Sequence, residues 1–236
     1  MEMPTEENPV VVHNGDCLDL LRQLPDGCVD AVVTDPPYGV ELGNTNNNTV
    51  GGRHGLVRNS YATGGDTYEE YLVTVPPAIV QSRRVADRVA VFIGPHIWDL
   101  PKADAIGGVY CPNAAARHQW GFKNLLPVLF YGKAPDLHLG VREQTVIRST
   151  VKAEKNGHPC PKPVEWMRWL IRLTTRPDET VLDPFAGSGT TGVAAMLEGR
   201  RAILIEREPA YCDIIRRRLD HASGTGKGSL FAGAAN

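Results

Sequence analysis

The sequence predicts an α/β fold in which helices flank a mostly parallel sheet. Three observations carry this prediction. Residues 180–206 read as a strand, a glycine-rich turn, a helix and a second strand in immediate succession. Short β-branched apolar runs at 29–33, 88–94 and 126–132 have the length of buried strands. Helical patterns alternate with these runs, and such alternation is typical of parallel sheets.

Length and composition indicate one globular domain. The chain has 236 residues, of which 42% are hydrophobic and 22% charged, and we expect a single domain over 1–222. The Gly- and Ala-rich tail, 223–236, is expected to be disordered. No apolar run approaches the roughly 20 residues of a membrane helix, and the acidic N-terminus has no signal pattern, so we expect a cytoplasmic protein. The five cysteines contain no C-x-x-C pair, so no structural metal is expected.

Proline positions shape the predicted helices. Pro76 and Pro77 predict a kink or a restart in the first helix. Pro163 stands at a favoured first-turn position of the second helix, in which Trp166 and Trp169 share one apolar face and are predicted core residues. The predicted helices span 73–84, 163–175, 190–199 and 209–222.

Charge is distributed unevenly along the chain. The net charge is −2, yet residues 1–41 hold nine acidic side chains and one Arg, so the remainder has a basic surplus. Two irregular stretches, 39–66 and 134–157, lie in that remainder. Their basic residues are candidates for phosphate contacts, with ordinary solvated surface an equally good explanation. The candidates are Arg53, Arg58, Lys152 and Lys155.

A glycine-rich turn at 187–192 matches G-x-G-x-x-G between a strand and a helix. Such glycines let the backbone approach a ligand at a helix N-terminus, and an acid about 20 residues further on binds a ribose diol. Glu206 ends the next strand, 19 residues after Gly187. The pattern indicates a nucleoside-containing cofactor and leaves both NAD and S-adenosylmethionine open. A dinucleotide-binding fold usually starts with this fingerprint, but here only one further strand follows it. The chain is therefore expected to be circularly permuted relative to that order, with the cofactor-binding half last.

A second motif follows the 29–33 strand at the sheet edge where ligands bind. Asp35, Pro36, Pro37 and Tyr38 combine a carboxylate, a backbone turn with two missing amide donors, and a flat aromatic face. Asp35 and the Pro36 carbonyl can each accept one hydrogen of an exocyclic amino group while Tyr38 stacks on the ring. Two acceptors beside an aromatic face therefore indicate a planar base with an amino group.

These two motifs together resemble the S-adenosylmethionine-dependent amino-DNA methyltransferases. Asp35-Pro36-Pro37-Tyr38 precedes Asp183-Pro184-Phe185-Ala186-Gly187-Ser188-Gly189-Thr190-Thr191-Gly192, which is similar to the motif order of the beta class. Asn14–Leu18 resembles the family's entry segment, His158–Pro163 its H-P-x-x-K-P segment, and Trp120–Asn124 with Phe130–Lys133 its aromatic segment. The interval 134–157 is too short for that family's separate target-recognition region.

The resemblance implies a Rossmann-like methyltransferase fold with helices on both faces of the sheet. It implies an enzyme that flips a base from double-stranded DNA and methylates its amino group, with no metal. Asp35 favours adenine N6, and cytosine N4 is the alternative. The implied catalytic residues are Asp35, Pro36, Pro37 and Tyr38. The implied cofactor-binding residues are Asp16, Cys17, Lys162, Asp183, Pro184, Phe185, Ala186, Gly187, Ser188, Gly189, Thr190, Glu206 and Arg207, and Phe122 joins the basic candidates for DNA binding.

Other functions are open at this point. A nicotinamide-dependent oxidoreductase would use the same glycines and Glu206, but it leaves Asp35–Tyr38 unexplained. A protein-glutamine methyltransferase and a catalytically silent DNA-binding relative are further alternatives. The recognition sequence, a homodimeric state and a cognate restriction endonuclease are likewise open.

Overall fold

The structure is a computed structural model that describes residues 1–40, 66–114, 117–118, 121–135, 144–154 and 161–224. Within these ranges one eight-stranded sheet has the order β1-β10-β9-β2-β3-β7-β4-β8. Its pairings are parallel except where β7 meets β3 and β4. The strands are β1 (Val10–Asn14), β2 (Val29–Thr34), β3 (Ala86–Phe92), β4 (Ala105–Tyr110), β7 (Leu125–Tyr131), β8 (Val146–Arg148), β9 (Thr180–Asp183) and β10 (Arg201–Glu206), with β5 (Arg117–His118) and β6 (Gly121–Phe122) forming a separate pair.

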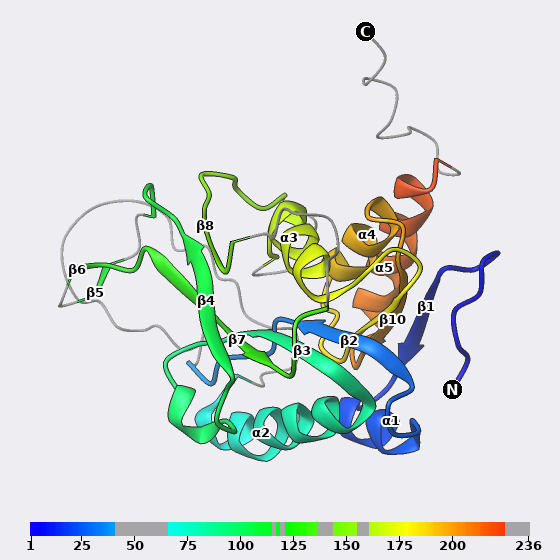
Figure 1. Cartoon of the computed structure of the whole chain (residues 1–236), viewed down its shortest axis with the longest axis horizontal. Helices are drawn as coiled ribbons and strands as arrows, with labels where there is room; N and C mark the ends of the chain where they lie inside the picture. The colour runs from blue at the N-terminus through cyan, green and yellow to red at the C-terminus, as the bar shows by residue number, and fades with distance from the viewer. Residues whose placement is uncertain (41–65, 115–116, 119–120, 136–143, 155–160, 225–236) are drawn as a thin grey trace, which may run out of the picture.

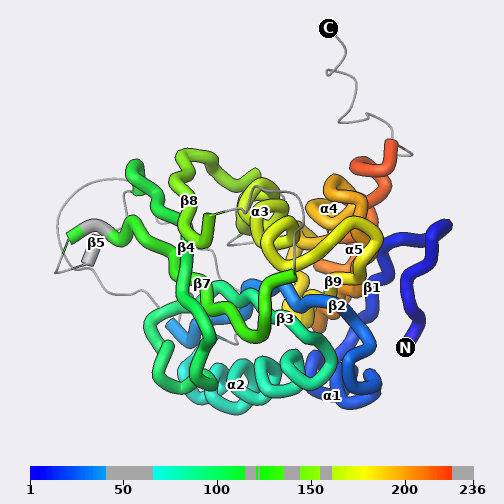
Figure 2. Tube along the Cα trace, in the orientation of Figure 1, coloured from blue at the N-terminus to red at the C-terminus, as the bar shows by residue number. Residues whose placement is uncertain are grey.

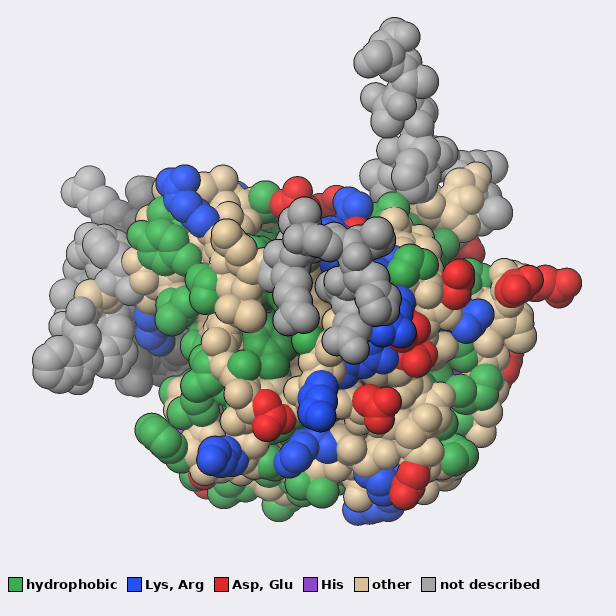
Figure 3. Space-filling view, in the orientation of Figure 1, with side chains coloured by type: hydrophobic (Ala, Val, Ile, Leu, Met, Phe, Trp, Pro, Cys, Tyr) green, Lys and Arg blue, Asp and Glu red, His purple; other side chains and the backbone are tan. Residues whose placement is uncertain are grey.

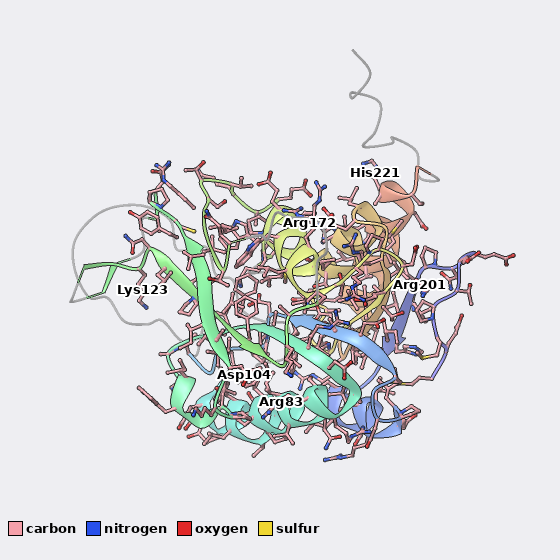
Figure 4. All side chains as sticks on the ribbon, in the orientation of Figure 1. Arg83, Asp104, Lys123, Arg172, Arg201 and His221 are labelled. Carbon is pink, nitrogen blue, oxygen red and sulfur yellow. The ribbon has the colours of Figure 1, made fainter. Side chains whose placement is uncertain are left out.

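Helices cover both faces of this sheet, as the sequence predicted (Figure 1). One face carries α1 (Cys17–Gln23) and α2 (Tyr68–Val85), with a 3-10 turn at Ile97–Asp99. The other carries α3 (Val164–Thr174), α4 (Thr190–Leu197) and α5 (Pro209–Ala222). In Figure 4, Arg83 on α2 and Arg172 on α3 lie on opposite sides of the sheet.

Alternate residues of the central strands form two cores. Val32, Leu182 and Ile203 pack on the side of α1 and α2. Their neighbours Val33 and Val181 pack on the other side, against Trp169 and Leu170 of α3. Successive side chains of a strand point to opposite faces, so strands covered on both faces must be apolar throughout. This accounts for the continuous apolar runs.

The first strand lies beside the last one. β1 pairs in parallel with β10 from Val10–Ala202 to Asn14–Glu206, and Figure 2 shows the N-terminal strand next to the C-terminal elements. The sheet therefore begins with the cofactor half of the chain at one edge. This arrangement confirms the permuted order, because β9 and β10 come last in sequence yet lie between β1 and β2, the first two strands of the chain.

The predicted restart in the first helix is wrong, because α2 continues through both prolines. Each proline leaves one carbonyl of the preceding turn without an amide donor. Those carbonyls belong to Leu72 and Val73, which are 40% and 67% exposed, so water can hydrogen-bond to them. The helix also begins earlier than predicted, at a capping box formed by Thr67 and Glu70.

The remaining predictions differ in detail. Pro163 occupies the N-cap of α3 and not its first turn, and α4 ends at Leu197. Helix α5 has the predicted bounds. Strands β1, β4 and β8 of the sheet, and the separate pair β5 and β6, were not predicted. The tail beyond Gly224, nearly all of the stretch 39–66, and residues 136–143 and 155–157 of the stretch 134–157 lie outside the described residues. In the described part of the chain, no helix has both the length and the apolar character needed to cross a membrane.

Candidate active site

Four neighbouring parallel strands have their carboxyl ends side by side. Asn14, Thr34, Asp183 and Glu206 are their last residues. The chain leaves β2 toward α2 on one face and leaves β9 toward α4 on the other. Because β2 and β9 are neighbours, the space between them is a topological switch point, where open α/β sheets bind ligands.

A buried hydrogen-bond network joins the two motifs at this point. The Thr34 hydroxyl donates to Asp183 Oδ1 at 2.6 Å, and the Thr191 hydroxyl donates to Oδ2 at 2.5 Å. The amide of Phe185 also donates to Oδ1, at 3.0 Å. Asp183 is 1% exposed, and burial raises the pKa of its carboxyl to about 6 despite these three donors. Asp183 therefore ties β9 to β2, to the turn at Phe185 and to α4.

Asp35 lies directly after β2, with both carboxylate oxygens engaged. The Tyr38 hydroxyl donates to Oδ1 at 2.6 Å. The Lys162 ammonium donates to Oδ2 at 2.5 Å, in an ion pair whose side chains are 12% and 18% exposed. Lys162 precedes α3, so this contact joins the start of that helix to the end of β2.

Close backbone packing holds Tyr38 in place. Gly94 follows β3, and a Cβ there would lie 2.7 Å from the Tyr38 Cβ and 2.9 Å from its ring. Gly39 has φ +65°. Its amide donates to Asp66 Oδ1 at 2.7 Å, and its carbonyl oxygen lies 3.3 Å from His96 Nε2. The residue after Tyr38 is thus held from two sides.

The glycine-rich turn is bound to the end of β10 through Glu206. The Gly187 amide donates to Glu206 Oε2 at 2.8 Å, and the Glu208 amide donates to Oε1 at 2.8 Å. Glu206 is 9% exposed, and burial raises the pKa of its carboxyl. A carboxylate has about four lone-pair sites, so acceptor capacity remains for a ligand hydroxyl.

Two predicted cofactor residues have structural tasks. Asp16 caps α1 by accepting from the amides of Leu18 and Asp19 at 2.9 and 3.2 Å. Cys17 is buried, and burial raises the pKa of its thiol to about 12. This thiol is therefore neutral at physiological pH and is no nucleophile.

Both motifs line one cavity of about 350 Å³, a size typical of small-molecule sites. All four predicted catalytic residues line it. So do all predicted cofactor residues except Gly189, which has φ +78° and faces Ile215 of α5, 2.9 Å from the position of a Cβ. The lining residues that were predicted are Asp16, Cys17, Asp35, Pro36, Pro37, Tyr38, Lys162, Asp183, Pro184, Phe185, Ala186, Gly187, Ser188, Thr190, Glu206 and Arg207.

Sequence reasoning missed several residues of this site. Glu70, Met167 and Tyr211 also line the cavity. Arg218 of α5 supports the glycine turn, because its guanidinium donates to the Ser188 carbonyl at 2.7 Å and to the Thr190 hydroxyl at 3.1 Å. Arg218 lies three residues after the buried Ile215. Residues at this spacing share one face of a helix, so the sequence could have indicated that Arg218 faces the interior.

The predicted DNA contacts lie largely outside the described residues. Arg53, Arg58 and Lys155 belong to segments that are not described, as does the Phe122 side chain. Lys152 is exposed and does not line the cavity. Figure 3 shows Lys and Arg side chains spread over one face among acidic and apolar ones. In the described ranges, no group of three or more His, Cys, Asp and Glu residues is arranged to hold a metal ion.

A family model described as DNA methylase matches residues 96–217, more than half of the chain. The chain belongs to the DNA methylase family. The chain is similar to the "Putative methylase YubD" of Escherichia coli (strain K12), 29% identical over 225 residues that cover 87% of this chain and 88% of YubD. The type II methyltransferase M.HinfI of Haemophilus influenzae is 25% identical over 242 residues, covering 88% of this chain and 67% of M.HinfI.

Solved structures of DNA methylases have the same fold. TTHA0409 of Thermus thermophilus, in complex with S-adenosyl-L-methionine, superimposes with a TM-score of 0.65 at 19% identity, over 95% of this chain and 99% of that one. The predicted Rossmann-like methyltransferase fold is confirmed. The prediction of a DNA methyltransferase is confirmed at the level of the family, which leaves the nicotinamide-dependent oxidoreductase without support.

Proposed function

We propose that this DNA methylase transfers a methyl group from S-adenosylmethionine to the N6 amino group of adenine in double-stranded DNA. One observation carries the proposal. The Asp35–Tyr38 turn and the glycine turn with Glu206 line the same cavity. A base with an amino group and a nucleoside cofactor can therefore be bound side by side. Action on DNA also supports the cytoplasmic location expected from the sequence.

The cavity suits S-adenosylmethionine in its chemistry. The Glu206 carboxylate would accept from the ribose hydroxyls, with the Gly187 turn beside it, because an acid at the end of the second strand serves this purpose in nucleotide folds. Phe185 and Met167 supply apolar surface, and both line the cavity. When bound, the cofactor supplies an electrophilic methyl group on a positively charged sulfur.

The residues after β2 would orient the amino group. Asp35 and the Pro36 carbonyl accept its two hydrogens, and the Tyr38 ring stacks on the base. Holding both hydrogens in this way directs the nitrogen lone pair away from the ring system and toward the methyl group. The new N–C bond would form as the methyl–sulfur bond breaks, so that S-adenosylhomocysteine leaves and the nitrogen loses one of its two protons to solvent. Positioning and fixed acceptors supply the catalysis. The base must leave the duplex first, at a cost of a few kcal/mol that stacking and hydrogen bonds offset.

Adenine is the proposed target because Asp35 stands first in the motif. The cytosine-N4 enzymes of the resembled class more often have Ser at this position. The identity of this residue supports adenine through resemblance, since both bases present an exocyclic amino group to the same acceptors.

The test uses the full chain, S-adenosylmethionine labelled in its methyl group, and unmethylated plasmid DNA. Mass analysis of the nucleosides should yield labelled N6-methyldeoxyadenosine. Labelled N4-methyldeoxycytidine would overturn the adenine assignment, and the absence of label in DNA would overturn the proposed function. Asp35→Ala should abolish transfer while binding S-adenosylhomocysteine as the parent does, and the exposed Asp213→Ala serves as its matched control.

A further inference from the structure

The Asp35 carboxylate is held from two sides. Tyr38 donates to one oxygen and Lys162 to the other, at 2.6 and 2.5 Å. The ammonium of Lys162 also lies 5.2 Å from the centre of the Tyr38 ring and 5.7 Å from that of Phe92. Cations at such distances are attracted to the aromatic face, so the Lys162 head group has three independent contacts that fix its place.

This arrangement determines the plane of the carboxylate. A lone hydrogen bond lets a carboxylate rotate about its Cβ–Cγ bond, whereas donors on both oxygens oppose that rotation. The two donors use two of about four lone-pair sites, so the carboxylate can still accept from an incoming amino group. Both bonds are charge-assisted, and therefore of the stronger kind, because the acceptor is a carboxylate. The Lys162 bond in addition joins two opposite charges.

We propose that Lys162 is a positioning residue of the methyl transfer and acts through Asp35. The resemblance places this lysine among the cofactor-binding residues, whereas its ion pair is with the residue that would bind the target amino group. This inference rests on the proposed function. It assigns Lys162 to the base side of the cavity and predicts that its loss slows transfer without weakening cofactor binding.

The test compares Lys162→Met with Lys162→Arg in the full chain, using the labelled-methyl assay on plasmid DNA. Lys162→Met should lower kcat by about ten- to a hundredfold, the effect expected for a lost charge-assisted bond. The KM for S-adenosylmethionine and the Kd for S-adenosylhomocysteine should not change. Lys162→Arg should restore part of kcat. Lys102→Met, at an exposed lysine, is the matched control.

A double-variant cycle separates action through Asp35 from a direct role. In an Asp35→Asn background, Lys162→Met should alter the residual kcat by less than about twofold, since coupled residues are not additive. An equal loss in both backgrounds would overturn the proposal. Weaker binding of S-adenosylhomocysteine by Lys162→Met, or an unchanged kcat, would overturn it as well.

Two controls complete the test. If Lys162→Met melts at a lower temperature than the parent, Lys162→Gln replaces it, because glutamine retains a hydrogen-bond donor without the charge. The parent enzyme is measured in the same assay. Failure of the parent to label DNA contradicts the proposed function, whereas an active parent with an unaffected Lys162→Met contradicts only the role of Lys162.

Discussion

The hydroxyl of Thr34 donates a 2.6 Å hydrogen bond to Asp183, a residue 149 positions further along the chain. This bond joins the last residue of β2 to the last residue of β9, and thereby the base-side motif to the cofactor-side motif. The two halves of the candidate site are therefore linked by a direct buried contact as well as by the sheet.

Replacing Thr34 with Val should destabilise the protein by about 1–3 kcal/mol, because a buried charged acceptor loses a donor. Val keeps the shape of Thr, so little packing is lost. Chemical denaturation measures the effect. Thr34→Ser keeps the hydroxyl and should retain most of the stability. Equal stabilities for the Val and Ser variants would mean that this hydrogen bond contributes nothing.

Asp183 should make stability depend on pH. Its folded pKa of about 6 is above the ordinary 3.8, so its stabilising contribution is complete below about pH 4 and is lost as pH rises through 6. Between about pH 4 and 7, the unfolding free energy of the parent should therefore fall relative to that of Asp183→Asn by on the order of 3 kcal/mol. Denaturant titrations of both proteins across that range provide the test. A difference independent of pH would contradict the raised pKa.

Replacing Glu206 with Gln should weaken cofactor binding about ten- to a hundredfold, the effect of losing a charge-assisted hydrogen bond. Calorimetric titration with S-adenosylhomocysteine measures the affinity. The side-chain NH2 of Gln would face the backbone amide of Gly187 or Glu208, and two donors facing each other could destabilise the fold. Thermal unfolding of the variant is therefore recorded alongside. Glu69→Gln, on the exposed side of α2, is the control. Unchanged affinity would refute the assignment of Glu206 to the ribose.

Gly94→Ala should impair transfer and leave cofactor binding intact. The added methyl group would lie 2.7 Å from the Tyr38 Cβ, so the ring must move. A displacement of about 1 Å at a reacting centre can cost a hundredfold in rate. Single-turnover methylation and S-adenosylhomocysteine binding are measured on the same preparation. Transfer at the parental rate would show that Tyr38 tolerates the shift.

The sequence predicts the two motifs and the strands before them because each strand is a continuous apolar run that ends at a Gly- or Pro-marked turn. β4 escapes this reasoning. Its adjacent Gly107 and Gly108 read as a break. In the sheet they are needed, because a Cβ at either position would collide with the backbone of a neighbouring strand or loop, at Thr145 O and Leu126 O.

Contacts between distant residues were also beyond sequence reasoning. Lys162 and Asp35 are 127 positions apart, and no periodicity in either segment relates them. The segment around Lys162 was recognised only through resemblance, which indicated the cofactor as its partner. Glu206 was correctly placed at the end of β10, but its bond to the Gly187 amide depends on the turn's conformation.

The hydrogen bond between the Gly39 amide and Asp66 brings both ends of an intervening stretch of chain to one point. The distance that this stretch must span is therefore independent of its length. Doubling its number of residues would add only about 0.6 kcal/mol of closure entropy. As long as this hydrogen bond forms, a longer or shorter stretch between Gly39 and Asp66 therefore begins and ends at the same two points, next to Tyr38 and next to the first turn of α2.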